Sequence, residues 1–295
     1  MSNVTVLTPT YNRGKLLQKL YESLCAQDCK DFEWLIVDDG STDDTSKCVE
    51  QMKRTADFPI FYYKKKNGGK HTALNYAYQF IKTPLIFIVD SDDSLTGNAI
   101  SCVNEIYKEY KDEYNLCGFS FLRGKPDGGY LSTSGVPQDG MKESYVECRI
   151  NRNIGGDMAE VWYTHCLKEY PFPEFQGETF LGEDIVWVRM SKKYKMRFFN
   201  RVIYISDYLE DGLTNNRRKN NIKSPNGCVA RAEAFLNSDS NIKAKIKAAL
   251  QYQIYGRFAQ IDMRKMYQKT NSKGLFLLFF LPAQILYVAW KSRIN

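Results

Sequence analysis

The chain has 295 residues, of which 43% are hydrophobic and 25% are charged, and its formal net charge is +7. This length suffices for one large α/β core with a smaller appendage, and the composition excludes a disordered chain. Eight cysteines are scattered without a Cys-x-x-Cys pair and only two histidines are present, so we expect reduced thiols and no structural zinc site. Because no basic stretch followed by an apolar one opens the chain, we expect no signal peptide and a cytoplasmic location.

The charge is unevenly distributed along the chain. Residues 1–211 carry 26 Lys and Arg against 31 Asp and Glu, whereas residues 212–295 carry 15 against 3. A basic segment of this kind favours an anionic partner, which can be a membrane surface, a lipid phosphate or a nucleic acid. Its aromatic residues lie in apolar runs and not between Arg and Lys as stacking platforms, so we expect no nucleic-acid partner.

Strands and helices are predicted to alternate in the first hundred residues. Apolar runs predict strands at residues 4–7, 32–37, 60–63 and 85–89. Apolar positions at helical spacing predict helices between them, at residues 16–25, near 48–52 and at 71–81. Four such units predict a parallel, doubly wound α/β sheet.

The following residues are predicted to extend the same domain. A helix should run from Thr96 to Tyr110, and further strands are expected at residues 116–122, 159–163 and 197–206. Another amphipathic helix should begin near residue 182. The segment 123–141, rich in Gly, Pro and Ser, is predicted to be a long loop that is either a binding lid or disordered.

In the last third of the chain, the sequence predicts one basic amphipathic helix and one apolar helix. Residues 242–261 form a basic amphipathic pattern, and residues 275–290 are apolar apart from Gln284 and contain Pro282. Sixteen residues fall short of the roughly 20 needed to span a bilayer. We therefore expect an interfacial helix or a re-entrant membrane anchor with Tyr287 and Trp290 at headgroup level, and the alternative is a core helix packed on the catalytic domain.

The strongest chemical signal follows the strand predicted at residues 85–89. The apolar run leads directly into Asp90, Asp92 and Asp93, at the edge where open α/β sheets bind ligands. Three carboxylates so close together repel one another, which favours a divalent cation, Mg²⁺ or Mn²⁺, held between them and a substrate phosphate. The alternative is a solvated turn in which Asp93 or Ser94 caps the next helix.

Five motifs in order resemble those of the family 2 glycosyltransferases, and the resemblance covers roughly residues 3–212. The motifs are Pro9-Thr10-Tyr11-Asn12, Val37-Asp38-Asp39-Gly40-Ser41-Thr42-Asp43, Asn67-Gly68-Gly69-Lys70 with Asn75, Asp90-Ser91-Asp92-Asp93 and Gly182-Glu183-Asp184. The resemblance implies a GT-A fold, Rossmann-like with a mainly parallel sheet, over residues 1–212. Residues 1–93 would bind the nucleotide-sugar and residues 94–212 the acceptor, followed by a helical basic extension over residues 213–295.

The resemblance also implies the donor site. In the family the turn after the first strand flanks the base and the second Asp of the Asp-Asp-Gly-Ser motif, here Asp39, accepts the N3–H of uracil. A carboxylate is only an acceptor, which favours UDP, with dTDP as the next choice. The implied donor-binding residues are Pro9, Thr10, Tyr11, Asn12, Asp39, Gly69, Lys70, Asn75, Asp90 and Ser91. Lys70 can approach the pyrophosphate or the base, or it can be a solvated lysine in a basic run.

Metal and catalytic residues follow from the same resemblance. Asp92 and Asp93 are the implied metal ligands, and because no His stands near the domain's end, the possible further ligands are Asp207, Glu210 and Asp211. Asp184 matches the catalytic base of an inverting transfer, in which one carboxylate takes the proton of the acceptor hydroxyl. The alternative for Glu183 and Asp184 is favourable charge at a helix N-terminus. Glu183 and Trp187 are expected near the acceptor, although Trp187 can equally be core.

Together these features predict a metal-dependent, inverting glycosyltransferase that uses a UDP-sugar. The Gln-x-x-Arg-Trp motif of processive relatives is missing, which implies single addition. The basic extension predicts a peripheral location on the inner face of the cell membrane. It also predicts a saccharide acceptor in cell-surface polysaccharide biosynthesis, with polyprenyl phosphate as the expected carrier. The alternatives are a non-catalytic nucleotide-sugar-binding subunit of a synthase complex and a sugar nucleotidyltransferase, although no phosphate loop follows the first strand.

Overall fold

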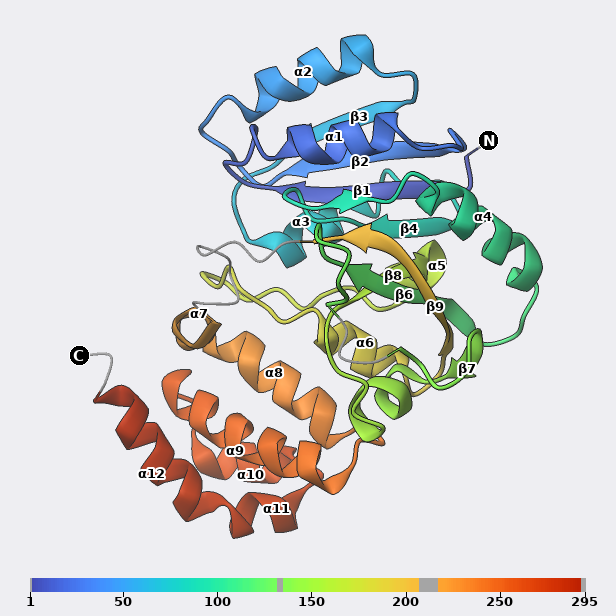
Figure 1. Cartoon of the computed structure of the whole chain (residues 1–295). Coiled ribbons are helices and arrows are strands. Elements are labelled where there is room, and N and C mark those ends of the chain that lie inside the picture. Colours follow the sequence, from blue (N-terminus) through green and yellow to red (C-terminus); the bar gives the residue numbers. More distant parts are fainter. Residues whose placement is uncertain (1, 132–134, 207–216, 293–295) are drawn as a thin grey trace. The chain divides into compact units, whose positions relative to one another are not determined.

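The computed structural model describes residues 2–131, 135–206 and 217–292 (Figure 1). The chain divides into two compact units. The first comprises Met1–Ser144, Ile154–Pro171 and Lys193–Leu209, and the second comprises Tyr145–Asn153, Phe172–Lys192 and Glu210–Asn295. This division differs from a single boundary at residue 212, because the segment that carries Asp184 folds with the C-terminal helices.

The first unit is built on one sheet of nine strands. They are β1 (Val4–Thr10), β2 (Phe32–Asp38), β3 (Ile60–Lys64), β4 (Leu85–Ile88), β5 (Ser94–Leu95), β6 (Leu116–Gly124), β7 (Met141–Glu143), β8 (Met158–Tyr163) and β9 (Lys195–Ile205). Their order is β3-β2-β1-β4-β8-β6-β9-β5, with β7 paired to β9. Figure 1 shows β3, β2, β1 and β4 side by side, and these four run parallel, as the sequence predicted. The other half is mixed because β8 is antiparallel to both β4 and β6.

Helices connect these strands. They are α1 (Leu17–Cys25), α2 (Thr45–Thr55), α3 (Lys70–Ala77), α4 (Ala99–Tyr110) and α5 (Thr164–Glu169). On α1, Leu17, Leu20 and Leu24 recur at spacings of three and four residues and are fully buried. Burial of each leucine contributes roughly 1.5–3 kcal/mol. Such packing fixes the strands whose carboxyl ends carry the predicted site.

The second unit is helical. Its helices are η1 (Val146–Asn151, a π-helix), α6 (Asp184–Met190), α7 (Arg217–Lys223), α8 (Pro225–Leu236), α9 (Ile242–Phe258), α10 (Met263–Lys269), α11 (Lys273–Leu278) and α12 (Phe280–Lys291). The helices α8, α10, α11 and α12 all pack on α9. The α9 N-terminus is capped by Asn241, whose side-chain oxygen accepts from the Ala244 N–H at 3.0 Å. The basic amphipathic pattern thus forms the central helix of this unit.

The apolar C-terminal segment forms two helices that have one packed and one exposed face. Tyr287 contacts the ring of Phe258 at 4.9 Å between centroids, and Trp290 contacts Tyr255 at 6.0 Å. Both rings therefore pack on α9 and are half-buried, and their position at headgroup level stays a prediction. The opposite face exposes large apolar side chains, namely Leu277, Leu278, Leu281, Ile285 and Val288. Among the described residues, no helix combines the length and apolar character needed to cross a membrane.

Candidate active site

The predicted donor-binding residues lie at the carboxyl ends of β1, β2 and β4 and along α3. They are Pro9, Thr10, Tyr11, Asn12, Asp39, Gly69, Lys70, Asn75, Asp90 and Ser91. These ends meet at one edge of the sheet because β1 is parallel to both β2 and β4. Ligands of open α/β sheets bind at this edge.

The turn after β1 is fastened to the loop after β2. The Asn12 N–H donates to Ser41 Oγ at 2.8 Å, and the Thr42 N–H donates to Asn12 Oδ1 at 2.7 Å. Beside these bonds, Tyr11 is 47% exposed. Thr10 is buried, and its hydroxyl has no hydrogen-bond partner among the residues that the structure describes. The turn therefore offers a ligand one accessible aromatic ring, that of Tyr11.

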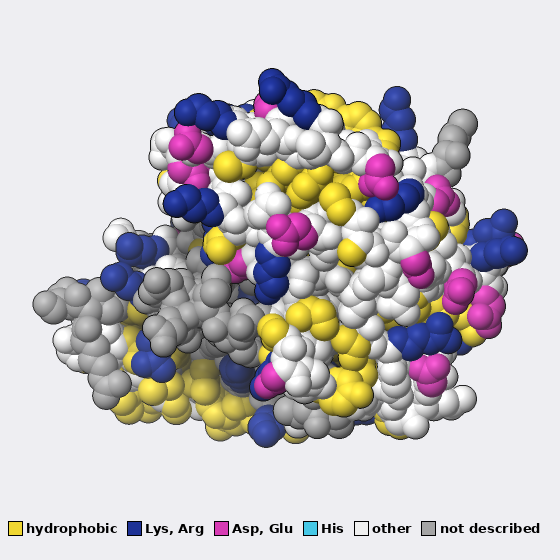
Figure 2. Space-filling model, turned by 45° about the horizontal axis from the view of Figure 1, so that its top comes forward, with side chains coloured by type: hydrophobic (Ala, Val, Ile, Leu, Met, Phe, Trp, Pro, Cys, Tyr) yellow, Lys and Arg dark blue, Asp and Glu magenta, His cyan; other side chains and the backbone are white. Residues whose placement is uncertain are grey.

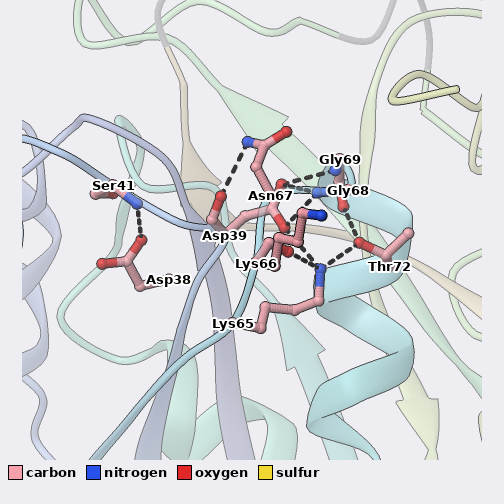
Figure 3. A network of polar contacts seen from close by, with 9 residues as sticks. All are labelled: Asp38, Asp39, Ser41, Lys65, Lys66, Asn67, Gly68, Gly69 and Thr72. Atoms are coloured by element: carbon pink, nitrogen blue, oxygen red, sulfur yellow. Dashed lines mark hydrogen bonds and ion pairs between the residues drawn. The ribbon is translucent and has the colours of Figure 1, made fainter. Parts of the chain in front are cut away.

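Asp39 holds the Gly-rich loop onto the end of β2 (Figure 3). Its carboxylate accepts from the Gly69 N–H at 2.7 Å, from the Gly68 N–H at 3.0 Å and from Lys65 Nζ at 2.9 Å. Lys65 in turn donates to the Thr72 hydroxyl at 2.7 Å. Gly69 has a φ of 93°, which favours glycine at this position. The predicted uracil acceptor is thus a buried carboxylate that already organises the loop next to α3.

The neighbouring carboxylate, Asp38, has a structural role that the sequence did not reveal. Its side chain is fully buried. One oxygen accepts from the Ser41 N–H at 2.6 Å, and the other accepts from the Tyr62 hydroxyl. Burial, together with the bond to Asp38, raises the pKa of Tyr62 above its usual value, so this phenol remains a donor. Asp38 therefore shapes the turn, and both of its carboxylate oxygens are engaged by donors of the protein.

Each carboxylate of the acidic cluster has a different partner. Asp90 pairs with Lys70 at 2.5 Å between Oδ1 and Nζ, and Asp92 pairs with Arg13 at 2.8 Å between Oδ2 and Nη1. Asp93 instead lies in the interior, where it accepts from the Tyr204 hydroxyl at 2.7 Å. The structure thus brings the predicted donor-site residues Lys70 and Asp90 together.

A buried arginine lies beneath this cluster. The Arg123 guanidinium stacks over the Tyr204 ring at 4.1 Å from its centroid and lies 3.9 Å from a carboxylate oxygen of Asp93. Burial opposes ionisation of Asp90, but Lys70 and Arg123 outweigh it and hold the pKa of Asp90 below its usual value. Burial and the nearby charge of Asp90 raise the pKa of Asp93 to about 7. The pKa values of Asp90 and Asp93 are therefore shifted in opposite directions, so the two carboxyl groups differ in how readily they ionise.

The donor set fits a divalent cation that is completed by substrate oxygens. Mg²⁺ is usually bound through one or two carboxylates together with substrate phosphates, and not by an all-protein cage. Within the described ranges, no group of three His, Cys, Asp or Glu side chains is arranged to hold a metal. Asp92 keeps 18% of its side chain exposed, whereas Asp93 is 8% exposed and bonded to Tyr204. The geometry favours Asp92 over Asp93 as the ligand. Asp207, Glu210 and Asp211 lie outside the described residues.

The predicted base belongs to the second unit and has one strong partner. Asp184 stands in the first turn of α6, where the helix N-terminus favours a carboxylate. Arg231 of α8 donates to it from Nε to Oδ1 at 2.5 Å and also from Nη2 to Oδ2. Asp184 pulls the pKa of Arg231 upward against the effect of burial, so the guanidinium stays charged. The base is thus held in a bidentate ion pair.

The two predicted acceptor residues differ in their surroundings. Glu183 is half-buried directly before α6. Trp187 is 6% exposed and packs edge-on against Phe172 at 5.9 Å between ring centroids. The structure therefore places Trp187 among core side chains of its unit, in line with the alternative reading of this residue.

Sequence reasoning missed several partners of the predicted residues, namely Arg13, Lys65, Arg123, Tyr204 and Arg231. Arg13 directly follows the first motif, and Arg231 stands between two alanines on an apolar helix face, which is an unusual position for a solvated cation. The roles of Arg13 and Arg231 could therefore have been suspected from their positions in the sequence. Nothing local connects Arg123 with Tyr204, which are 81 residues apart in the sequence.

Comparisons with known proteins identify related glycosyltransferases. The family model described as Glycosyl transferase family 2 matches residues 5–151. A relative from Campylobacter jejuni, GalNAc(5)-diNAcBac-PP-undecaprenol beta-1,3-glucosyltransferase, is 24% identical over 98% of this chain and 93% of its own length. The Staphylococcus aureus poly(ribitol-phosphate) beta-N-acetylglucosaminyltransferase TarS is 28% identical over 50% of this chain, and the match spans 24% of TarS.

Solved structures show the same fold. The structure of S. aureus TarS 1–349 in complex with UDP-GlcNAc has a TM-score of 0.60 and 20% identity, covering 94% of this chain and 78% of that one. A mannosyltransferase from Pyrobaculum calidifontis in complex with GDP-Man and Mn²⁺ has a TM-score of 0.58 and 18% identity, covering 98% and 83%. The fold is therefore GT-A, as the motifs predicted, and the chain belongs to the family 2 glycosyltransferases.

Proposed function

We propose that this glycosyltransferase moves one sugar at a time from a UDP-sugar to a hydroxyl of a saccharide acceptor, with inversion and with the help of Mn²⁺ or Mg²⁺. The observation that carries the proposal is the edge of the first unit's sheet. There an accessible carboxylate, Asp92, lies beside Arg13, and Lys70 at the start of α3 lies beside Asp90. Cations and carboxylates at the end of parallel strands suit a nucleoside diphosphate with a divalent ion.

Donor binding uses groups that are internally paired in the structure. Arg13 and Lys70 can exchange their carboxylate partners for diphosphate oxygens, and Arg suits this role because its guanidinium forms two parallel hydrogen bonds. Tyr11 supplies a ring for the base. Asp39 is assigned to the uracil N3–H, for which it exchanges one of the four donor contacts that hold its two oxygens. The TarS complex with UDP-GlcNAc supports UDP as the nucleotide.

Catalysis requires a general base and stabilisation of the negative charge that develops on the departing UDP. We assign the base to Asp184, which takes the proton of the acceptor hydroxyl as that oxygen attacks C1 of the donor sugar. Arg13 and Lys70 stabilise the charge that remains on UDP. A divalent ion, when bound through Asp92 and assisted by Asp90, would add Lewis-acid stabilisation of the departing diphosphate. The Mn²⁺ complex of the P. calidifontis enzyme supports such a requirement.

We propose a lipid-linked saccharide as the acceptor. The C. jejuni relative, which matches nearly the full chain, is named for an undecaprenyl-diphosphate-linked saccharide. We therefore propose that the enzyme acts at the inner face of the cell membrane, in the synthesis of a cell-surface polysaccharide or glycolipid.

The exposed face of α11 and α12 supports a peripheral position on that membrane. Leu278, Leu281 and Ile285 are each about 70% exposed, and soluble monomers rarely expose a contiguous apolar patch of this kind. Lys273 at the start of α11 and Lys291 at the end of α12 lie at its two ends, as basic residues do on interfacial helices. Figure 2 shows hydrophobic side chains along the lower margin of the molecule, with Lys and Arg among them. We assign this face to an anionic lipid surface.

The assignment of Asp184 is tested by Asp184→Asn. We expect the variant to bind UDP-sugar with unchanged affinity and to release UDP about 10²–10⁴-fold more slowly, because it lacks the general base. Calorimetric titration with UDP measures binding, and a UDP-release assay measures turnover. Near-normal turnover in the variant would remove Asp184 from this role.

A further inference from the structure

Asp184, the predicted catalytic base, forms a two-point ion pair with Arg231. Both carboxylate oxygens accept from the guanidinium, one from Nε at 2.5 Å and the other from Nη2. Arg231 is 18% exposed and Asp184 is 23% exposed, so neither is a freely solvated surface charge. A bidentate pair of this kind fixes the plane of the carboxylate as well as its position.

The surroundings are built to hold Arg231 in this position. Its guanidinium lies over the Phe235 ring at 4.8 Å from the centroid. Gly182 leaves the necessary space, because a methyl group there would lie 3.1 Å from Asp184 Oδ1 and 3.2 Å from Arg231 Cδ and Nε. A side chain at this position would therefore press on both members of the pair.

The loop before Asp184 is also fixed to the helix that carries Arg231. Buried Glu178 accepts from the N–H groups of Asn226 and Gly227, each at 2.8 Å, in the first turn of α8. A carboxylate at a helix N-terminus is favourable. The Phe180 N–H donates to Ser224 Oγ at 3.2 Å directly before that helix. Hydrogen bonds of Glu178 and Phe180 therefore join the loop before Asp184 to the start of α8, the helix that carries Arg231.

We propose that Arg231 is a positioning residue for the catalytic base, so that the C-terminal helices take part in catalysis. This inference rests on the proposed role of Asp184. A general base must present a lone pair to the acceptor hydroxyl in one orientation, and a carboxylate in the first turn of a helix is otherwise free to rotate about its side-chain bonds. Each carboxylate oxygen has two lone-pair sites, and the hydrogen bonds from Arg231 occupy one of them on each oxygen.

The structure offers a specific way to test this. A pocket opens beside the guanidinium and is lined by Phe180, Gly182, Asn221, Gln251, Arg231 and Tyr255. Arg231→Ala would leave a space continuous with this pocket. Guanidinium ion can then enter and replace the missing group, and rescue of kcat at unchanged affinity for UDP would indicate a role in positioning the base.

The experiment compares Arg231→Ala, Arg231→Lys and the wild type by UDP release and by titration with UDP. We expect Arg231→Ala to lose about 10²-fold in kcat, as expected for a misplaced catalytic group, with unchanged affinity for UDP. Guanidinium, below concentrations that denature the wild type, should restore part of this loss in Arg231→Ala and none in Asp184→Asn. Arg231→Lys should be intermediate, because it keeps the charge but loses the bidentate geometry. Arg257→Ala, an exposed position of the same unit bonded to Gln284, is the matched control.

Several results would overturn the inference. They are a wild-type kcat in Arg231→Ala, a loss that guanidinium does not restore, and a loss in Arg231→Lys equal to that in Arg231→Ala. If Arg231→Ala does not fold, the variants Arg231→Lys and Gly182→Ala test the inference instead. Each keeps helix α8 but disturbs the ion pair between Arg231 and Asp184. Each should therefore lower kcat without weakening UDP binding. Wild-type turnover in Asp184→Asn removes the base itself. Wild-type turnover in Arg231→Ala beside an inactive Asp184→Asn removes only the role of Arg231.

Discussion

The exposed face of α11 and α12 gives the most quantitative prediction. Leu281 and Ile285 are four residues apart on α12 and are 70% and 69% exposed. Burying a large apolar side chain fully is worth roughly 1.5–3 kcal/mol, so inserting these exposed parts into a membrane contributes about 1–2 kcal/mol each. Leu281→Ser combined with Ile285→Ser should therefore weaken vesicle binding by about 2–4 kcal/mol, or roughly 30- to 700-fold.

Co-sedimentation with lipid vesicles measures this change. The wild type should bind vesicles that contain anionic lipid more tightly than neutral ones, because each Lys or Arg near an anionic surface adds about 1 kcal/mol, and Lys273 and Lys291 end the two helices. Tyr114→Ser is the matched control, since Tyr114 is 82% exposed but belongs to the first unit. Thermal melting should be unchanged in both variants. Wild-type vesicle binding by the double variant, or no vesicle binding by the wild type, would refute the membrane assignment.

Two further predictions concern the sheet edge. Arg13→Met should weaken binding of UDP by about 1.5–3 kcal/mol while leaving uridine binding unchanged, because Arg13 is assigned to the diphosphate; equal losses for both ligands in calorimetry would contradict this role. For Asp93, the pKa is raised to about 7, so the folded protein holds this proton to a higher pH than the unfolded chain does. The resulting stability is present at low pH and lost as the pH rises through about 7. Asp93→Asn, which cannot ionise, should gain in melting temperature relative to the wild type between pH 5.5 and 8.5 in EDTA. A constant difference between the two proteins would speak against a raised pKa.

The fold was predictable where local pattern and burial agree. The strands β1, β2 and β4 are buried along nearly their whole length and end in polar motifs, so their parallel direction and their binding edge could be predicted from the sequence. The antiparallel direction of β8 could not be predicted, because it depends on β8 pairing with β4 and β6 after a long connection in the chain. The same holds for Tyr287 and Trp290, whose aromatic character suits a membrane interface and a helix contact equally well.

The candidate site was predictable in its residues but not in its partners. The carboxylates Asp39, Asp92 and Asp184 follow from motifs, whereas what each one contacts depends on tertiary structure. Asp39 is covered by backbone N–H groups of a loop almost 30 residues away, and Asp184 is held by Arg231. No spacing rule connects positions 184 and 231, which meet only because α8 packs against α6.

The most direct test of the central claim is the release of nucleoside diphosphate from a panel of UDP-, dTDP- and GDP-sugars, with and without Mn²⁺, by the wild type and by Asp92→Asn. We predict metal-dependent turnover of one UDP-sugar by the wild type and loss of that turnover in the variant. Turnover that is the same with Mn²⁺ and with EDTA, or that survives Asp92→Asn, would contradict the proposed mechanism. Binding of a sugar nucleotide without turnover in the presence of saccharide acceptors would favour a non-catalytic subunit.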